Sequence, residues 1–263
     1  MENALLILQS LLIPFLLVIC LALFQSVAYV LILKAGRFAF YVTAFFGVFI
    51  HELSHALMAV IFRHKVLKID FFNPSPDGTL GSVSHAYNPR NIYHVIGNFF
   101  IGMAPLIGGV ATIYAMTRLL LPESASVFAL VVDNKHALES SNSLVELFKL
   151  SSLIAQDLML LLREQYMSAP INVLVWGYLT GSVALQMTPS STDFKGSFVS
   201  GCLILIVLSL ICYFPIGKSL VIANIQVAIG LSSVYLLCIA LTILITLWLL
   251  AIYILTSLFR RQV

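Results

Sequence analysis

Residues 47–63, GVFIHELSHALMAVIFR, form an apolar run whose middle holds the polar group HELSH. The run has the composition of a helix buried in lipid. Residues four apart lie on one face of a helix, so His51 and His55 can present two imidazole nitrogens to a single metal ion. Glu52 then lies beside the metal, where it can take a proton from a bound water molecule. The pattern therefore predicts a zinc-dependent hydrolytic centre within an apolar helix.

The composition places this helix in a membrane. Of the 263 residues, 60% are hydrophobic and 10% are charged, with a mean hydropathy of +1.03, whereas soluble domains carry about 25% charged residues. Ionisable groups inside a bilayer are costly, so HELSH indicates function more strongly than hydrogen bonding to another helix. The net charge of +3 is spread along the chain, and no nucleic-acid partner is expected.

Six segments approach the length of about 20 apolar residues that a membrane span requires. We expect an all-α polytopic membrane protein in which residues 1–263 form a single membrane-embedded domain. The first segment should be a retained helix, because its leader MENA is acidic and no cleavage site follows it. The predicted spans are about 4–33, 38–62, 94–121, 171–188, 198–213 and 225–258.

Two segments between the spans have a character of their own. Residues 66–87 hold two β-prone runs on either side of the turn signal NPSPDG, which predicts a short membrane-associated β-hairpin after the HELSH helix. Residues 122–170 are of mixed polarity and predict an amphipathic helical segment, with a capping box formed by Ser143 and Glu146. His64 and His136 are assigned to the surface.

HELSHALMA inside a span resembles the site-2 protease family of intramembrane zinc metalloproteases, in particular its small members without a PDZ domain. KVLKID and GTLGSV look like the strands that follow the motif helix, and GNFFIGMAPLIGG looks like the small-residue helix next to it. The resemblance covers about residues 38–120 and 171–200. It implies Zn²⁺ as cofactor, Glu52 as general base and then acid, and a transmembrane segment of another membrane protein as substrate.

The resemblance also implies an orientation that the Lys/Arg distribution alone does not decide. The active site would lie near the cytosolic face, with both termini in the cytosol and residues 122–170 outside. The compact architecture suits a bacterial plasma membrane.

In the family the third zinc ligand is an aspartate from a later span, and Asp193 in MTPSSTDFKG matches that position best. It directly follows the fourth predicted span and is the only acidic residue between Glu164 and the C-terminus. The second and fourth spans run in the same direction, so the second half of one and the far end of the other approach the same membrane face. The remaining aspartates are Asp70, Asp77, Asp133 and Asp157.

The sequence departs from the family pattern around Asp193. Pro189 stands four residues before it and Gly196 three after, and no asparagine occupies the expected place, where Gln186 could supply an amide. Imidazole and carboxylate both suit zinc. The rival third ligands are His85, His94 and Asp70.

Substrate binding is predicted on the hairpin and on the third span. A transmembrane helix hides its amides in its own hydrogen bonds, so it must unwind before hydrolysis, and an exposed strand edge can receive the extended segment. Gly81, Ser82 and Val83 would lie on that edge, and Asn98 would line the cleft. An inert connecting hairpin and a packing role for Asn98 are the alternatives.

Two other functions fit HELSH. One is a zincin whose third ligand is a downstream glutamate, with Glu139, Glu146 and Glu164 as candidates. The other is a non-proteolytic zinc-binding membrane scaffold or transporter. Transporters usually carry several intramembrane acidic or histidine residues on more than one span, and outside HELSH this chain has few.

Overall fold

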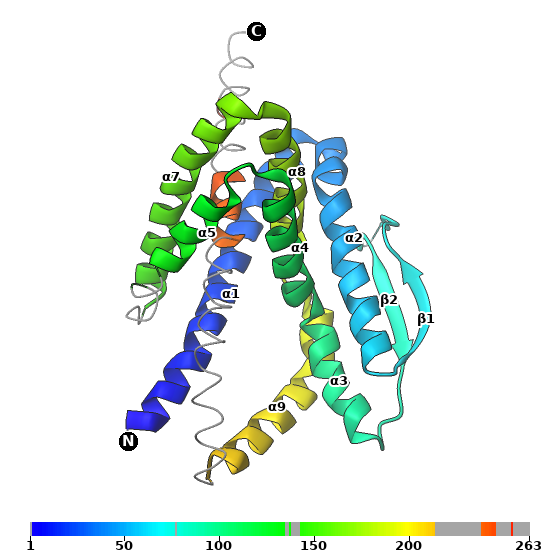
Figure 1. Cartoon of the computed structure of the whole chain (residues 1–263). Helices are drawn as coiled ribbons and strands as arrows, with labels where there is room; N and C mark the ends of the chain where they lie inside the picture. Colours follow the sequence, from blue (N-terminus) through cyan, green and yellow to red (C-terminus); the bar gives the residue numbers. More distant parts are fainter. Residues whose placement is uncertain are drawn as a thin grey trace.

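The computed structural model describes residues 2–76, 78–134, 137, 143–213, 238–245 and 254. Over these residues the chain is mostly helical with one small two-stranded sheet (Figure 1), as the sequence predicted. In chain order the elements are α1 (Glu2–Ala35), α2 (Arg37–Ile61), β1 (Lys65–Asp70), β2 (Ser82–Ala86), α3 (Ile92–Gly102), α4 (Ala104–Leu120), α5 (Ser124–Asp133), α7 (Leu144–Ser168), α8 (Pro170–Gln186) and α9 (Ser191–Tyr213).

Two of the described helices are long and apolar enough to cross a membrane, at Leu16–Lys34 of α1 and Arg37–Ile61 of α2. The pair α3 and α4 would make a third span if the two count as one. Helix α8 covers most of the predicted fourth span and α9 contains the predicted fifth, although α9 begins earlier, at Ser191; neither is long and apolar enough to be a candidate span. The sixth predicted span lies outside the described residues apart from 238–245 and 254. Membrane association is thus supported, and six spans stay a prediction.

The segment predicted as the span 94–121 is not one straight helix, because the chain bends by 55° between α3 and α4. Pro105 lies in the first turn of α4, where its missing N–H is tolerated. A continuous helix would place its ring against the Ile101 carbonyl and would leave that carbonyl without its i+4 donor. The break releases the Ile101 carbonyl for another partner.

The predicted β-hairpin is present and lies beside α2 (Figure 1). Strands β1 and β2 pair antiparallel, from Lys65 opposite Ala86 to Asp70 opposite Ser82. Helix α2 ends where Arg63 adopts a left-handed backbone with φ 57°, and the next amide, of residue 64, donates to the carbonyl of residue 59. This turn sends β1 back along α2, so the hairpin is held next to the HELSH helix.

Helix α2 packs closely against α8 and α4. A Cβ added at Gly47 would overlap the Ser182 carbonyl oxygen of α8, and the Gly47 N–H donates to Ser182 Oγ over 2.7 Å. A Cβ at Gly108 of α4 would likewise overlap Ser54 Oγ. These contacts fix the rotation of α2 and hence the direction in which HELSH points.

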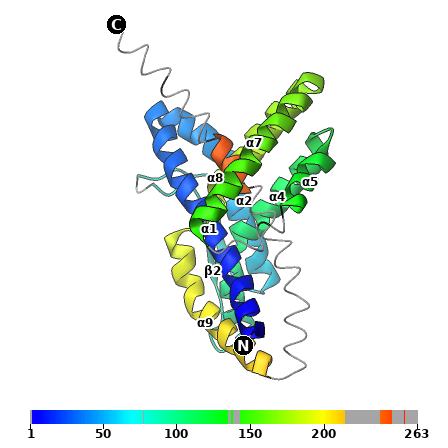
Figure 2. The ribbon, with the colours of Figure 1, turned by 90° about the vertical axis from the view of Figure 1, so that its left-hand side faces the viewer.

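Within the segment 122–170 the described residues form α5 and α7, which agrees with the predicted helical character. Ser143 caps α7 and its Oγ accepts from the Glu146 N–H over 3.2 Å. Helices α7 and α9 lie in opposite halves of the molecule in two perpendicular views (Figures 1 and 2). A buried stripe on α7 joins the core cluster that also contains Leu17 of α1 and Trp176 of α8, so α7 is part of the packed core. The stripe consists of Leu147, Leu150, Ile154, Ala155 and Leu158.

Candidate metal centre

His51 and His55 lie one turn apart on α2, and a main-chain carbonyl of another helix orients each ring. His51 Nδ1 is 2.6 Å from the Gln186 carbonyl oxygen, and His55 Nδ1 is 2.7 Å from the Ile101 carbonyl oxygen. A carbonyl only accepts hydrogen bonds, so we assign the proton of each neutral ring to Nδ1 and the lone pair to Nε2. The two Nε2 atoms face each other at 3.1 Å.

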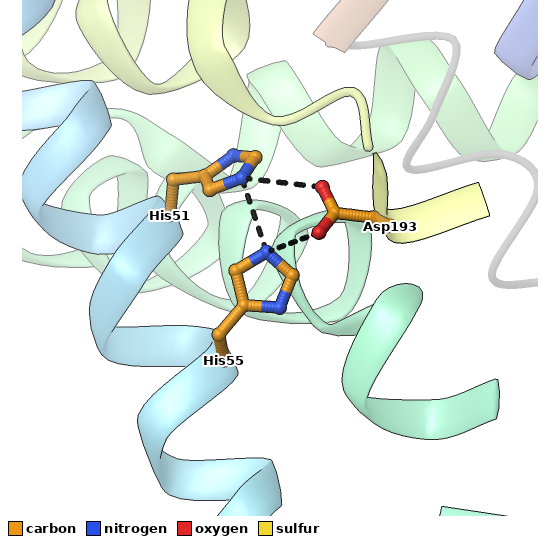
Figure 3. A group of neighbouring side chains, drawn as sticks. All are labelled: His51, His55 and Asp193. Atoms are coloured by element: carbon orange, nitrogen blue, oxygen red, sulfur yellow. Dashed lines mark hydrogen bonds and ion pairs between the residues drawn. The ribbon is translucent and has the colours of Figure 1, made fainter. Parts of the chain in front are cut away.

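Asp193 lies in the first turn of α9 and points its carboxylate at both histidines (Figure 3). Its Oδ2 is 3.8 Å from His51 Nε2 and its Oδ1 is 3.4 Å from His55 Nε2. The Ser190 N–H donates to Asp193 Oδ2 over 2.7 Å, and the Asp193 N–H donates to Ser190 Oγ over 3.2 Å. This reciprocal capping holds the carboxylate in place, and the helix N-terminus favours its negative charge.

With both rings neutral and the carboxylate ionised, three acceptors converge and have no proton to share with one another. Their ligand atoms lie within 4.8 Å of one another. Tetrahedral ligands about 2.0–2.1 Å from a zinc ion would lie about 3.3 Å apart, which is close to the separations of 3.1, 3.4 and 3.8 Å. The three predicted ligands are thus brought together, and the group could hold a metal ion.

The carbonyls that orient the histidines lack the i+4 donor of a continuous helix, because two helices are interrupted. The Ile101 carbonyl has lost its helical donor to Pro105, and Gln186 is the last residue of α8, where carbonyls have no intrahelical partner. The prediction gave Gln186 a role through its side-chain amide, whereas its main-chain carbonyl makes the contact with His51. Pro105 was the sequence signal for the free carbonyl beside His55.

Glu52 lies between the two histidines in the sequence of α2 and is only 6% exposed. A Cβ added at Gly81, just before β2, would lie 2.7 Å from Glu52 Cγ and 3.0 Å from its Oε1. The absence of a side chain at Gly81 lets the hairpin approach the glutamate closely. Glu52 of α2 therefore lies next to the start of β2.

The metal-binding group and Glu52 line a cleft of about 1780 Å³, which extends between the hairpin and helices α1, α3 and α9. Pockets for small molecules usually measure about 300–1000 Å³, so this cleft has room for a polypeptide segment. The four residues predicted to bind substrate all line it. They are Gly81, Ser82, Val83 and Asn98.

The rival third ligands lie apart from the group. Asp70 pairs with Lys68, whose Nζ is 2.5 Å from its Oδ2. His85 and His94 lie near His64. Within the described part of the chain, the group on α2 and α9 is the one cluster of three metal-ligating side chains. Of the candidate glutamates, Glu146 and Glu164 lie on α7, and Glu139 lies outside the described residues.

The prediction that His64 lies on the surface was wrong, because its side chain is 5% exposed. Its Nδ1 is 3.0 Å from His85 Nδ1, and its Nε2 donates to the His94 carbonyl over 2.9 Å. Burial lowers the pKa of His64, and burial together with the neighbouring His64 lowers the pKa of His85. Both rings therefore favour the neutral form. His136 lies outside the described residues.

Comparisons of the chain with known protein families, with curated proteins and with solved structures gave no match. The resemblance to site-2 proteases stays a prediction. The geometry supports a group that could bind a metal ion, carried partly by a helix that is long and apolar enough to span a membrane.

Proposed function

We propose that the protein is an intramembrane zinc endopeptidase of the site-2 protease type, which hydrolyses peptide bonds in or near transmembrane segments of other proteins. One observation carries the proposal. Three acceptors converge beside a buried glutamate, on a helix that is apolar enough to span a membrane. Ionisable groups in such a helix are costly and mark function by default.

The donor set fits zinc better than the alkaline-earth metals. Two imidazole nitrogens and one carboxylate oxygen are ligands that zinc accepts in catalytic sites, with a fourth position open. Calcium and magnesium favour sites built from oxygen alone. When bound, a zinc ion would polarise a water molecule and lower its pKa to about 7.

The chain's own residues account for the proton transfers. His51, His55 and Asp193 would hold the metal, and the carbonyls of residues 186 and 101 keep the two rings in the tautomer that faces it. Glu52 takes the proton of the attacking water, whose oxygen bonds to the peptide carbonyl carbon. As the C–N bond breaks, Glu52 delivers that proton to the leaving nitrogen.

The hairpin offers a place for an unwound substrate. β2 pairs with β1 on one edge, and no other described strand pairs with its second edge. Residues of β2 line the cleft that contains the metal-binding group. An extended segment can add to such an edge through main-chain hydrogen bonds, with Gly81, Ser82, Val83 and Asn98 around the peptide.

The family resemblance extends the proposal to location. The protein would reside in a bacterial plasma membrane, with the active site near the cytosolic face, both termini in the cytosol and residues 122–170 outside. Its partners would be lipid and a membrane-protein substrate.

The test combines metal analysis of purified protein with cleavage of a panel of co-expressed single-span proteins by the wild type and by Glu52→Gln. We expect zinc in both proteins and cleavage by the wild type alone. Zinc without cleavage in either would indicate the scaffold or transporter. Equal cleavage by Glu52→Gln would overturn the assignment of the base.

A further inference from the structure

We propose that His85 determines specificity in this cleft: its Nε2 accepts a hydrogen bond from a donor side chain of the bound polypeptide, about four residues from the scissile bond. This inference rests on the proposed function, because it names the segment that the cleft would recognise. It depends on three features of the structure, which are the tautomer of His85, its place along β2 and the face on which it lies.

The tautomer follows from a chain of contacts that begins at the His94 carbonyl. That oxygen only accepts, so His64 Nε2 carries the proton and His64 Nδ1 keeps the lone pair. His85 Nδ1 lies 3.0 Å from this lone pair and therefore donates to it. The neutral His85 ring is left with a lone pair on Nε2, and no described residue forms a hydrogen bond to that nitrogen.

The position of the His64 ring is constrained by its neighbours, and its contact with His85 constrains the His85 ring as well. Its ring is buried and stacks on Tyr87 with centroids 5.0 Å apart and an interplanar angle of 12°. The lowered pKa of both histidines, caused first by burial, supports neutral rings near pH 7. His94 and His55 are the other titratable groups that act on the pair.

The position along β2 sets the distance from the reacting bond. Gly81 lies against Glu52, and His85 lies four residues further along the same segment. At about 3.3 Å per residue, four residues span about 13 Å. Both residues line the cleft. A peptide extended along β2 with its scissile bond beside Glu52 would have a residue about four positions away opposite His85.

The face follows from the alternation of side chains in a strand. Residues separated by an even number lie on the same face, and Val83 and His85 are the half-buried residues of β2 while its other three are exposed. Side chains directly opposite each other on paired strands come within about 5.5 Å. The substrate side chain opposite His85 would therefore lie beside its ring, where Ser, Thr, Asn or Gln can donate to Nε2.

The experiment uses transmembrane peptides in detergent that carry Asn or Leu at single positions three, four and five residues from the cleaved bond, on both sides. Cleavage by the wild type gives KM and kcat. Binding to the Glu52→Gln protein gives a dissociation constant without turnover. His85→Phe removes the acceptor, and His85→Gln retains one as its side-chain oxygen.

We expect Asn four residues from the bond, on one side, to lower KM and the dissociation constant by about 2- to 10-fold relative to Leu, with little change in kcat. Asn at three or five residues would face the other side of the strand and give no gain. His85→Phe should remove the preference and His85→Gln should keep part of it.

Absence of any cleavage by the wild type would overturn the proposed function and the inference with it. Cleavage with no preference at four residues, or a preference that persists in His85→Phe, would overturn the inference alone. If His85→Phe does not fold, the position scan on the wild type and on His85→Gln decides the matter, because both require the periodic preference.

Discussion

Two histidine pairs with nearly the same nitrogen-to-nitrogen distance have different chemistry. His51 and His55 face each other at 3.1 Å, and His64 and His85 at 3.0 Å. In the first pair both Nδ1 atoms donate to carbonyls, so the lone pairs of the two neutral rings meet, and a cation between them would relieve their repulsion. In the second pair only His64 donates to a carbonyl, so His85 can supply the proton that joins the rings.

The difference shows that the spacing of two imidazoles does not identify a metal site. The partners of the outer nitrogens decide whether the inner nitrogens are two acceptors or a donor and an acceptor. The first pair also has the Asp193 carboxylate within 3.8 Å of both rings. Removing one ring from each pair should produce the largest difference in zinc binding.

We expect His55→Gln to lose its stoichiometric zinc, with an affinity loss beyond the 10- to 100-fold typical of outer-shell changes. The matched variant His85→Gln should still purify with one zinc per chain, because its pair is joined by a proton. Metal analysis after gel filtration in detergent measures both. Equal zinc loss in the two variants would show that the pairs do not differ as described.

Asp193→Asn should weaken zinc binding by about 10- to 100-fold or more, because it removes the negative charge while its side-chain oxygen can still cap α9. Asp70→Asn is the control, since Asp70 pairs with Lys68. Competition with a zinc-binding dye gives both affinities. A loss of zinc affinity in Asp70→Asn with none in Asp193→Asn would indicate that the third ligand is Asp70 on the hairpin.

Pro105→Ala should reduce zinc affinity by up to about tenfold, because a new N–H at this position can compete with His55 for the Ile101 carbonyl. Pro170→Ala is the control, since Pro170 opens α8, where no intrahelical donor is lost. The same dye competition measures the change. An unaltered affinity in Pro105→Ala would mean that the carbonyl does not depend on the proline.

Gly47→Ala should lower the free energy of unfolding by about 1–3 kcal/mol, because the added methyl group would overlap the Ser182 carbonyl of α8. Gly177→Ala places a methyl group where no atom lies within 4 Å and should be neutral or slightly stabilising. Chemical unfolding in mixed micelles compares them. Equal stabilities would argue against the close contact that seats α2 on α8.

Much of the site could be predicted from local patterns. The spacing of HELSH alone predicts two imidazoles on one face of a helix. NPSPDG predicts the hairpin, because its residues favour turns. Asp193 was found through the family resemblance, although the Ser190–Asp193 pair is also a capping pattern that indicates the start of a helix. The break at Pro105 was readable too, since proline ends a helix that runs into it.

The rest could not be predicted because it depends on tertiary contacts. Nothing in the sequence shows that the carbonyls of residues 101 and 186 lie beside His55 and His51, since these come from other helices. His64 was assigned to the surface, and its place between Arg63 and Lys65 gives no sign of burial. It is buried because the left-handed turn at Arg63 directs the chain back and the hairpin packs over its ring.

X-ray absorption at the zinc edge of protein loaded with one equivalent of zinc tests the metal centre most directly. We expect two imidazole ligands, with the remaining ligands oxygen at about 2.0–2.2 Å. The imidazole signal should be unchanged in His85→Gln and reduced in His55→Gln. A third imidazole, or an imidazole signal that falls in His85→Gln, would contradict the central claim that the α2 pair and Asp193 form the metal centre.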